Sequence, residues 1–122
     1  MSAIEEHLDR VRAKLDRVTV DELDAEVAAG ALVVDIRPVE QRERDGELPG
    51  AVVIDRNVLE WRLDPSSDAR SVELAEGQRV VVVCNEGYAS SLAAATLKDL
   101  GIEGATDLVD GYQAYRAARG EH

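Results

Sequence analysis

Apolar residues recur at three- and four-residue steps from Ile4 to Val18, and this period predicts an amphipathic helix over 4–18. Thr19 stands three residues before Glu22, which is the spacing of a capping box, so a second helix is expected to begin there. Gly30 follows the apolar positions of that helix and is expected to end it. The first 30 residues are therefore predicted to form two consecutive helices.

Short runs of aliphatic residues follow, and they have the length of strands rather than helices. They cover residues 31–36, 52–55, 78–84 and 106–109. Helical patterns are found over 57–63, 88–100 and 112–119, whereas 38–44 is interpreted as a short polar segment and 64–71 as a loop. Strands that alternate with helices predict an α/β fold of three layers, with a mostly parallel central sheet and helices on both faces.

The composition fits one domain with an aliphatic core and an acidic surface. The chain has 122 residues, of which 45% are hydrophobic but only 3% aromatic, and its formal charge is −11. A negative charge argues against nucleic acid as a partner, since binding phosphates requires clustered Lys and Arg. The N-terminal segment lacks the apolar stretch of a signal peptide, and no apolar run approaches the roughly 20 residues of a membrane helix. We expect a cytoplasmic protein without membrane contact, either a monomer or a weak homodimer.

The chain has a single cysteine, Cys84, and this excludes several kinds of site. One thiol cannot form an intrachain disulfide, a CxxC redox pair or a multi-thiolate zinc site. His7 and His122 lie near the ends of the chain, which argues against a Cys/His dyad and a His-ligated metal. We therefore expect no metal and no cofactor.

Cys84 stands where a buried strand is followed by a loop and then a helix. Open α/β sheets bind ligands at the carboxyl ends of their strands, and Asn85–Ala89 are few enough to turn tightly around the sulfur. Backbone N–H groups of such a loop, with the positive end of the next helix, form an anion site that favours a thiolate or a persulfide. Glu86 opposes this effect because its carboxylate disfavours a second negative charge nearby. A buried, inert cysteine is the alternative.

Five segments, in this order and spacing, resemble the rhodanese homology domain in its single-domain form. They are Thr19–Leu23, Asp35–Arg37, Leu48–Ala51, the Cys84 loop and Asp110–Tyr115. The resemblance implies a rhodanese-like three-layer domain, which we assign to residues 19–122. It does not cover the helix predicted within residues 1–18, which we expect to pack on the domain rather than to bind a partner. Tyr112 and Tyr115 stand where tryptophans are frequent in the family.

The resemblance further implies a sulfurtransferase or persulfide carrier. Cys84 would take sulfane sulfur from a small-molecule or protein persulfide donor and release it to a thiol or another thiophilic acceptor. The loop would bind substrate mainly through backbone N–H groups, and it comprises Asn85, Glu86, Gly87, Tyr88, Ala89 and Ser90. The hydroxyls of Ser90 and Ser91 are expected to serve as ordinary helix caps.

The chain departs from the family pattern at two places. Members that use thiosulfate typically have Arg or Lys in this loop, whereas residues 85–91 contain none and include Glu86. Weak thiosulfate activity is expected, unless Arg56 or Arg62 reaches the pocket. Glu47 stands before the Pro-Gly turn, where the family often has His, and this change leaves the nucleophile untouched.

Three polar or aromatic positions allow more than one interpretation. Asp35 and Arg37 could serve as a catalytic acid and cation, but we favour a structural ion pair that ties the first strand to a neighbouring loop. Trp61, the only tryptophan, either shapes the rim of the pocket or fills the core.

Two other protein classes are alternatives to the sulfurtransferase. Cysteine phosphatases and arsenate reductases need an arginine at the end of the loop to bind the oxyanion, and this chain has Ala89 and Ser90 there. A non-catalytic rhodanese-like binding or regulatory module, with the loop as its docking surface, remains the alternative function.

Overall fold

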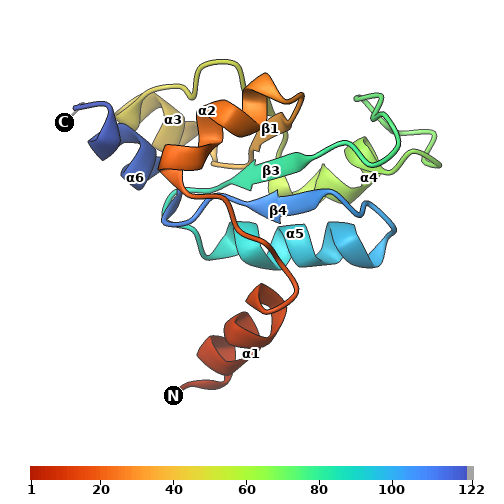
Figure 1. The fold of residues 1–122 in the computed structure, drawn as a ribbon, viewed down its shortest axis with the longest axis horizontal. Coiled ribbons are helices and arrows are strands. Elements are labelled where there is room, and N and C mark those ends of the chain that lie inside the picture. The colour runs from red at the N-terminus through yellow and green to blue at the C-terminus, as the bar shows by residue number, and fades with distance from the viewer. Residues whose placement is uncertain (121–122) are drawn as a thin grey trace.

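The computed structural model describes residues 1–120 and contains a parallel sheet between two layers of helices (Figure 1). Its strands lie in the order β2-β1-β3-β4. Their bounds are Leu32–Asp35 for β1, Val52–Val53 for β2, Val80–Val83 for β3 and Ala105–Asp107 for β4. The predicted α/β class and parallel sheet are confirmed. Glu121 and His122, at the end of the predicted domain, lie outside the described residues.

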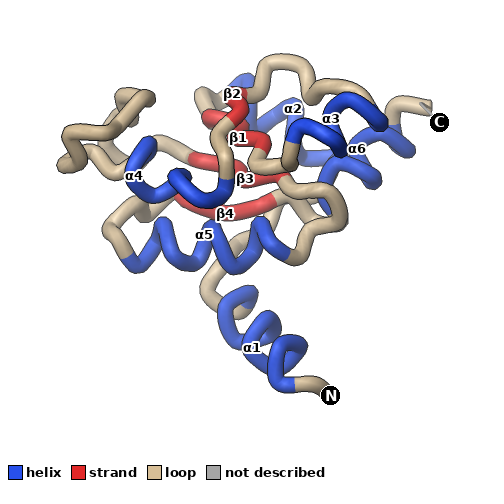
Figure 2. The backbone as a smooth tube through the Cα atoms, turned by 180° about the vertical axis from the view of Figure 1, so that it is seen from behind, coloured by secondary structure: helices blue, strands red, loops and turns tan. Residues whose placement is uncertain are grey.

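Helices cover both faces of the sheet (Figures 1 and 2). One face carries α4 (Leu59–Leu63), which the 3-10 turn η1 (Arg56–Val58) precedes, and α5 (Ala89–Asp99). The other face carries α2 (Val20–Ala28) and α6 (Gly111–Ala118), and α3 (Val39–Asp45) lies beside α6. None of the described helices is long and apolar enough to cross a bilayer.

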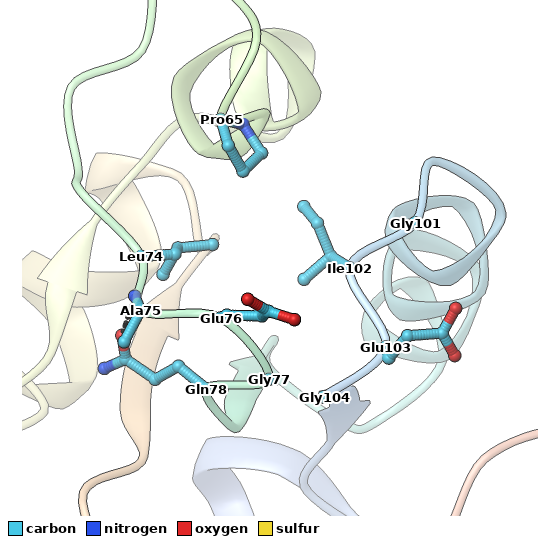
Figure 3. Close-up of a pocket in the computed structure, with 10 residues that line it drawn as sticks. All are labelled: Pro65, Leu74, Ala75, Glu76, Gly77, Gln78, Gly101, Ile102, Glu103 and Gly104. Carbon is cyan, nitrogen blue, oxygen red and sulfur yellow. Dashed lines mark hydrogen bonds between the residues drawn. The ribbon is translucent and has the colours of Figure 1, made fainter.

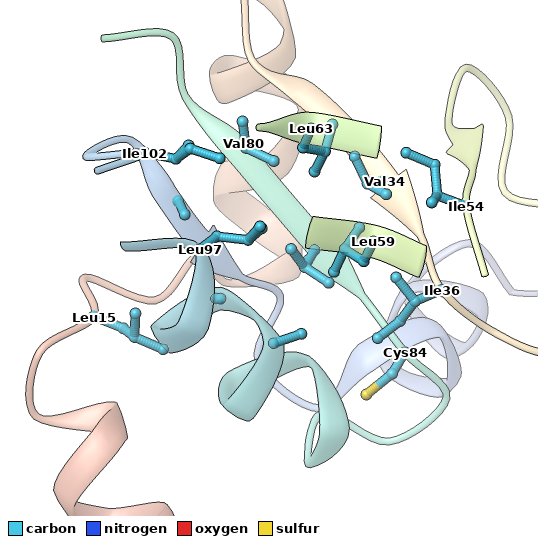
Figure 4. Close-up of a cluster of buried hydrophobic side chains, with 14 residues drawn as sticks. Leu15, Val34, Ile36, Ile54, Leu59, Leu63, Val80, Cys84, Leu97 and Ile102 are labelled. Carbon is cyan, nitrogen blue, oxygen red and sulfur yellow. The ribbon is translucent and has the colours of Figure 1, made fainter. Parts of the chain in front are cut away.

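The strands feed two hydrophobic cores because successive side chains point to opposite faces. In β3, Val80 and Val82 pack toward α4 and α5, whereas Val81 and Val83 pack toward α2 and α6. All four are fully buried, as expected for a strand covered on both sides. Figure 4 shows the first of these cores, with the Cys84 sulfur at one end beside Ile36.

The N-terminal helix α1 (Ala3–Arg12) is shorter than predicted, and the predicted helix over 4–18 is wrong in its second half. Leu15 is buried in the core beneath α5, whereas Val18 is buried in the core on the opposite face of the sheet. One helical stripe cannot reach both faces. Residues 13–18 instead pass the β4 edge, where Val18 forms a parallel bridge with Leu108.

Helix α1 lies outside the three layers and packs against α5 (Figure 2). The contact is apolar and buries Leu8 and Val11 against Ala95. A capping box between Ser2 and Glu5 closes the first turn of the helix. The packing brings the last residues of α1 close to the beginning of α5, where the Cys84 loop ends.

The short polar segment predicted over 38–44 proves to be helical, because α3 covers Val39–Asp45. None of its residues is buried, so the sequence offers no amphipathic period that would reveal a helix. Pro38 precedes its first residue with φ at −65°, a value suited to starting a helix, and Gly46 with φ at 102° ends it.

Candidate functional site

Cys84 is the first residue after β3, and its sulfur lies beneath the loop that leads into α5. The backbone N–H of Gly87 donates to Sγ at 3.1 Å, and the N–H of Ser90 donates at 3.3 Å. Both donors belong to the beginning of an 11-residue helix or the turn before it, where the helix dipole is positive. The loop therefore forms the nest of N–H groups that the sequence predicts around this sulfur.

The curvature of the loop depends on a glycine at position 87. Gly87 has φ at +88°, in the left-handed region that side chains disfavour. A Cβ atom here would lie 2.7 Å from the backbone nitrogen of Asp110, so the loop also packs directly on the turn that begins α6. Helix α6 binds the same loop, because Tyr112 N–H donates to the Cys84 carbonyl at 2.9 Å.

A buried carboxylate, Asp107, anchors the other end of the loop. It accepts hydrogen bonds from the Ser90 hydroxyl at 2.7 Å and from the Ser91 hydroxyl at 2.8 Å. The expectation that these serines cap the helix is wrong, since both lie inside α5 and point to the end of β4. Arg17 neutralises the carboxylate through Nε at 2.8 Å.

A cavity of about 330 Å³ opens beside Cys84. It is lined by Ile36, Arg37, Pro38, Gln41, Arg56, Cys84, Asn85, Glu86, Tyr88 and Ala89. Most of the predicted site residues therefore meet here. Two loop residues, Gly87 and Ser90, do not line the cavity. Their N–H groups donate to the sulfur.

Asp35 and Arg37 form the ion pair expected from the sequence. Both side chains are buried, and Arg37 Nη2 lies 2.8 Å from Asp35 Oδ2. The same nitrogen donates to the Gly46 carbonyl at 2.9 Å, which ties the end of β1 to the loop after α3. The guanidinium also stacks on the Tyr112 ring, with Cζ 3.7 Å from the ring centroid. Arg37 thus borders the cavity while its charge is bound to Asp35.

Arginines at two positions could bring positive charge to the pocket, and these positions differ. Arg56 lines the cavity, but its Nη1 lies 2.9 Å from both carboxylate oxygens of Glu60. Arg62 points away and donates to the Ala69 carbonyl. Trp61 is 56% exposed and does not line this cavity, so neither predicted role of this residue is correct.

The family follows from comparison with known proteins. Residues 19–118 match the rhodanese-like domain. The chain belongs to the rhodanese-like domain family. No curated protein matches the sequence of this rhodanese-like chain.

Several solved structures have a fold similar to that of this rhodanese-like domain. A protein of unknown function from Rhodopseudomonas palustris, described as a possible tyrosine phosphatase, has 30% identity and a TM-score of 0.85, over 98% of this chain and 92% of the other. The human single-domain sulfurtransferase has 26% identity and a TM-score of 0.66, over 83% and 95%. A rhodanese homologue from Thermus thermophilus has 28% identity and a TM-score of 0.60, over 80% and 98%. The rhodanese-like domain and the likeness to the human single-domain sulfurtransferase support a sulfurtransferase-type role in general.

Two arginines from outside the matched rhodanese-like region contact the loop, and sequence reasoning missed them. Arg12 Nη2 donates to the Gly87 carbonyl at 2.7 Å, and Arg17 Nη2 donates to the same oxygen at 3.1 Å. These contacts, and that of Arg17 with Asp107, join positions 70 or more residues apart. A local pattern carries no signal for such contacts.

A second cavity of about 470 Å³ lies at the opposite end of the rhodanese-like sheet, before β3 and β4 (Figure 3). The described residues that line it include the carboxylates of Glu76 and Glu103 but no thiol or hydroxyl group. It therefore offers no thiol for sulfur transfer, and Cys84 remains the candidate reactive centre.

Proposed function

We propose that the protein is a sulfurtransferase or persulfide carrier in which Cys84 is the sulfur-carrying nucleophile. The observation that carries the proposal is the pair of hydrogen bonds that the N–H groups of Gly87 and Ser90 donate to Sγ. Cys84 itself lines an open cavity. Such bonds stabilise negative charge on sulfur, whether it resides on a thiolate or on a persulfide. The likeness to the human single-domain sulfurtransferase supports the same reaction class.

The proposed reaction has two steps, and each moves one sulfur atom. In the first, the Cys84 thiolate forms a bond to the outer sulfur of the donor, the donor S–S bond breaks, and the donor leaves as a thiolate or, from thiosulfate, as sulfite. In the second, the acceptor forms a bond to that outer sulfur, and the electron pair of the broken S–S bond returns to Cys84. No external oxidant or reductant is required.

The fate of the persulfide follows from the cysteine content. Cys84 is the only cysteine of the chain, so a persulfide on it cannot be resolved by an internal disulfide. The sulfur must pass to another molecule. A small-molecule thiol or a cysteine of a partner protein is the acceptor class that we propose.

The charges around the cavity favour a donor other than thiosulfate. Glu86 lines the cavity, and the two cations there, Arg37 and Arg56, are bound to Asp35 and Glu60. A dianionic donor would therefore find little uncompensated positive charge. We propose a persulfide of a small thiol, or of a protein, as the better donor.

Phosphate chemistry is less well supported by the residues of the site. Ala89 and Ser90 occupy the end of the loop, where a cysteine phosphatase needs an arginine fork. The two arginines closest to the loop, Arg12 and Arg17, donate to the Gly87 carbonyl instead.

Transfer of sulfur from glutathione persulfide to an acceptor thiol or cyanide tests the proposal. The wild type is expected to accelerate the transfer, and Cys84→Ser is expected to abolish the acceleration. An aryl phosphate serves as the competing substrate. Transfer that Cys84→Ser leaves unchanged, or hydrolysis of the phosphate without sulfur transfer, would contradict the proposal; no reaction at all favours the binding or regulatory module.

A further inference from the structure

The Gly87 peptide groups point in two directions, and each direction has its own partner. The N–H donates to Cys84 Sγ at 3.1 Å, while the carbonyl accepts from Arg12 and Arg17 on the other side of the loop. A residue has only two soft backbone dihedrals, so holding the carbonyl restrains the direction of the neighbouring N–H. The two arginines therefore hold the peptide plane that follows the N–H donor to sulfur.

The same arginines hold the first turn of α5, which supplies the second N–H donor. Arg12 Nε donates to the Ser91 hydroxyl at 3.0 Å. Arg17 binds both carboxylate oxygens of Asp107, at 2.8 and 3.2 Å, and Asp107 in turn accepts from the Ser90 hydroxyl. One connected set of hydrogen bonds thus fixes both donors to Sγ.

The two arginines differ in their electrostatic effect. Arg17 is paired with Asp107, so its charge is largely offset. Arg12 has no salt bridge with any carboxylate in the described part of the chain, and its guanidinium lies 5.7 Å from the Tyr88 ring centroid. Arg12 therefore places net positive charge behind a loop that has no cation of its own.

The other charged groups around the sulfur are either paired with an opposite charge or negatively charged. On the cavity side they are the pairs Arg37–Asp35 and Arg56–Glu60, together with the carboxylate of Glu86. From α1, Glu5 borders an adjacent apolar hollow that shares Tyr88 and Ala89 with the cavity. Arg12 is thus the described cation nearest the loop whose charge no carboxylate neutralises.

We propose that Arg12 and Arg17 are positioning residues, which keep the N–H groups of Gly87 and Ser90 aimed at Cys84 Sγ. The segment 1–18 is then a functional part of the site, although it precedes the family match that begins at residue 19. Its role in sulfur transfer rests on the proposed function, whereas its effect on the thiol does not.

The test is the rate of Cys84 alkylation by iodoacetamide as a function of pH. Arg12→Gln is expected to move the midpoint of the profile to higher pH and to slow alkylation near neutral pH by roughly five- to tenfold, since it removes a charged hydrogen bond. Arg12→Lys is expected to recover part of the rate, because an ammonium keeps the charge but loses the two-pronged geometry.

Arg10→Gln is the matched control. Arg10 is exposed on the same helix, and its replacement removes the same charge without a contact to the loop. Arg17→Lys tests the second arginine, because Arg17→Gln would leave Asp107 buried without its cation. Amide hydrogen exchange of Gly87 supplies a second measurement, and it is expected to be faster in Arg12→Gln than in Arg10→Gln.

An Arg12→Gln protein with the pH profile and Gly87 exchange of Arg10→Gln overturns the proposal. A lower thermal midpoint with an unmoved profile also overturns it, because that is the result of a merely structural contact. Sulfur uptake by the wild type is measured separately. If the profile shifts but the wild type takes up no sulfur, the proposed function fails and the positioning role stands.

Discussion

At the residue scale, the sulfur of Cys84 is surrounded by backbone donors rather than by side-chain cations. Gly87 and Ser90 donate to it directly, and connected restraints hold the two N–H groups. Gly87 is restrained by its left-handed backbone and by the two arginines, whereas Ser90 is restrained by Asp107. Backbone donors cannot be removed by a simple side-chain deletion. Substitutions that test them must therefore change the residues that hold these N–H groups in place.

Gly87→Ala tests the backbone restraint. The new Cβ would meet the Asp110 nitrogen and would strain a φ of +88°, so the loop must move away from the sulfur. We expect the free energy of unfolding to fall by more than the roughly 1–2 kcal/mol of left-handed strain, and alkylation of Cys84 to slow markedly. Chemical denaturation and iodoacetamide kinetics measure the two effects.

Gly101→Ala is the control for that substitution. Gly101 has φ at +95°, but a Cβ there would have no atom within 4 Å. Gly101→Ala should lower the free energy of unfolding by the backbone strain alone and leave the alkylation rate of Cys84 unchanged. Equal behaviour of the two variants would show that contact with Asp110 does not shape the site.

The residues of the site could be predicted only where they are local in sequence. The position of Cys84 at a strand end and its N–H nest followed from a single segment of the chain. Arg12, Arg17 and Asp107 were missed because they reach the loop from distant segments. The roles of Ser90 and Ser91 were misjudged for the same reason, since their partner lies on β4.

At the scale of elements, Asp45 at the end of α3 connects that helix to α6. It lies 3.0 Å from Arg116 and accepts from Gln113 at 2.9 Å. The hydrogen bond from Arg44, supported by that from Gln113, lowers the pKa of the Asp45 carboxyl from 3.8 to about 2. Helix α6 in turn binds the Cys84 loop, so this contact supports the site from a distance.

The lowered pKa of Asp45 predicts a pH dependence of stability. Because the folded-state pKa lies below the unfolded value of 3.8, the stabilisation is fully present above about pH 4 and is lost as the pH falls toward 2. Asp45→Asn should lower the thermal midpoint at neutral pH, and its difference from wild type should shrink as the pH falls through about 2. The exposed Asp68 provides the control, as Asp68→Asn. A difference that is as large at pH 2 as at neutral pH would contradict the assignment.

The elements themselves were predictable where their periodic side chains are buried on one face. Helix α3 lacks buried residues, so no period marked it. The overlong N-terminal helix had the opposite cause, because Leu15 and Val18 keep a helical spacing while they enter cores on opposite faces. Tertiary packing, and not local pattern, ends α1 at Arg12.

At the scale of the whole molecule, the net charge of −11 disfavours the approach of an anionic donor. Glu86 adds negative charge at the cavity, and Arg12 acts from behind the loop. This arrangement stabilises charge that forms on the sulfur without attracting anions to the cavity entrance. It accounts for the proposed preference for a persulfide over thiosulfate.

Glu86→Arg tests this electrostatic account. Reversal of the charge should raise kcat/KM for thiosulfate by roughly five- to tenfold at low ionic strength, and the gain should shrink as salt is added. Glu76→Arg makes the same change of net charge at the cavity on the opposite end of the sheet and should have little effect. If thiosulfate turnover is unchanged or falls in Glu86→Arg, the account of donor preference is wrong.

The intact mass of the protein shows whether Cys84 carries sulfur. After incubation with glutathione persulfide and removal of the donor, the wild type should gain the mass of one sulfur atom, which an acceptor thiol then removes. Cys84→Ser should gain none. An unchanged wild-type mass with glutathione persulfide and with thiosulfate, or the same gain in Cys84→Ser, would contradict this role of Cys84.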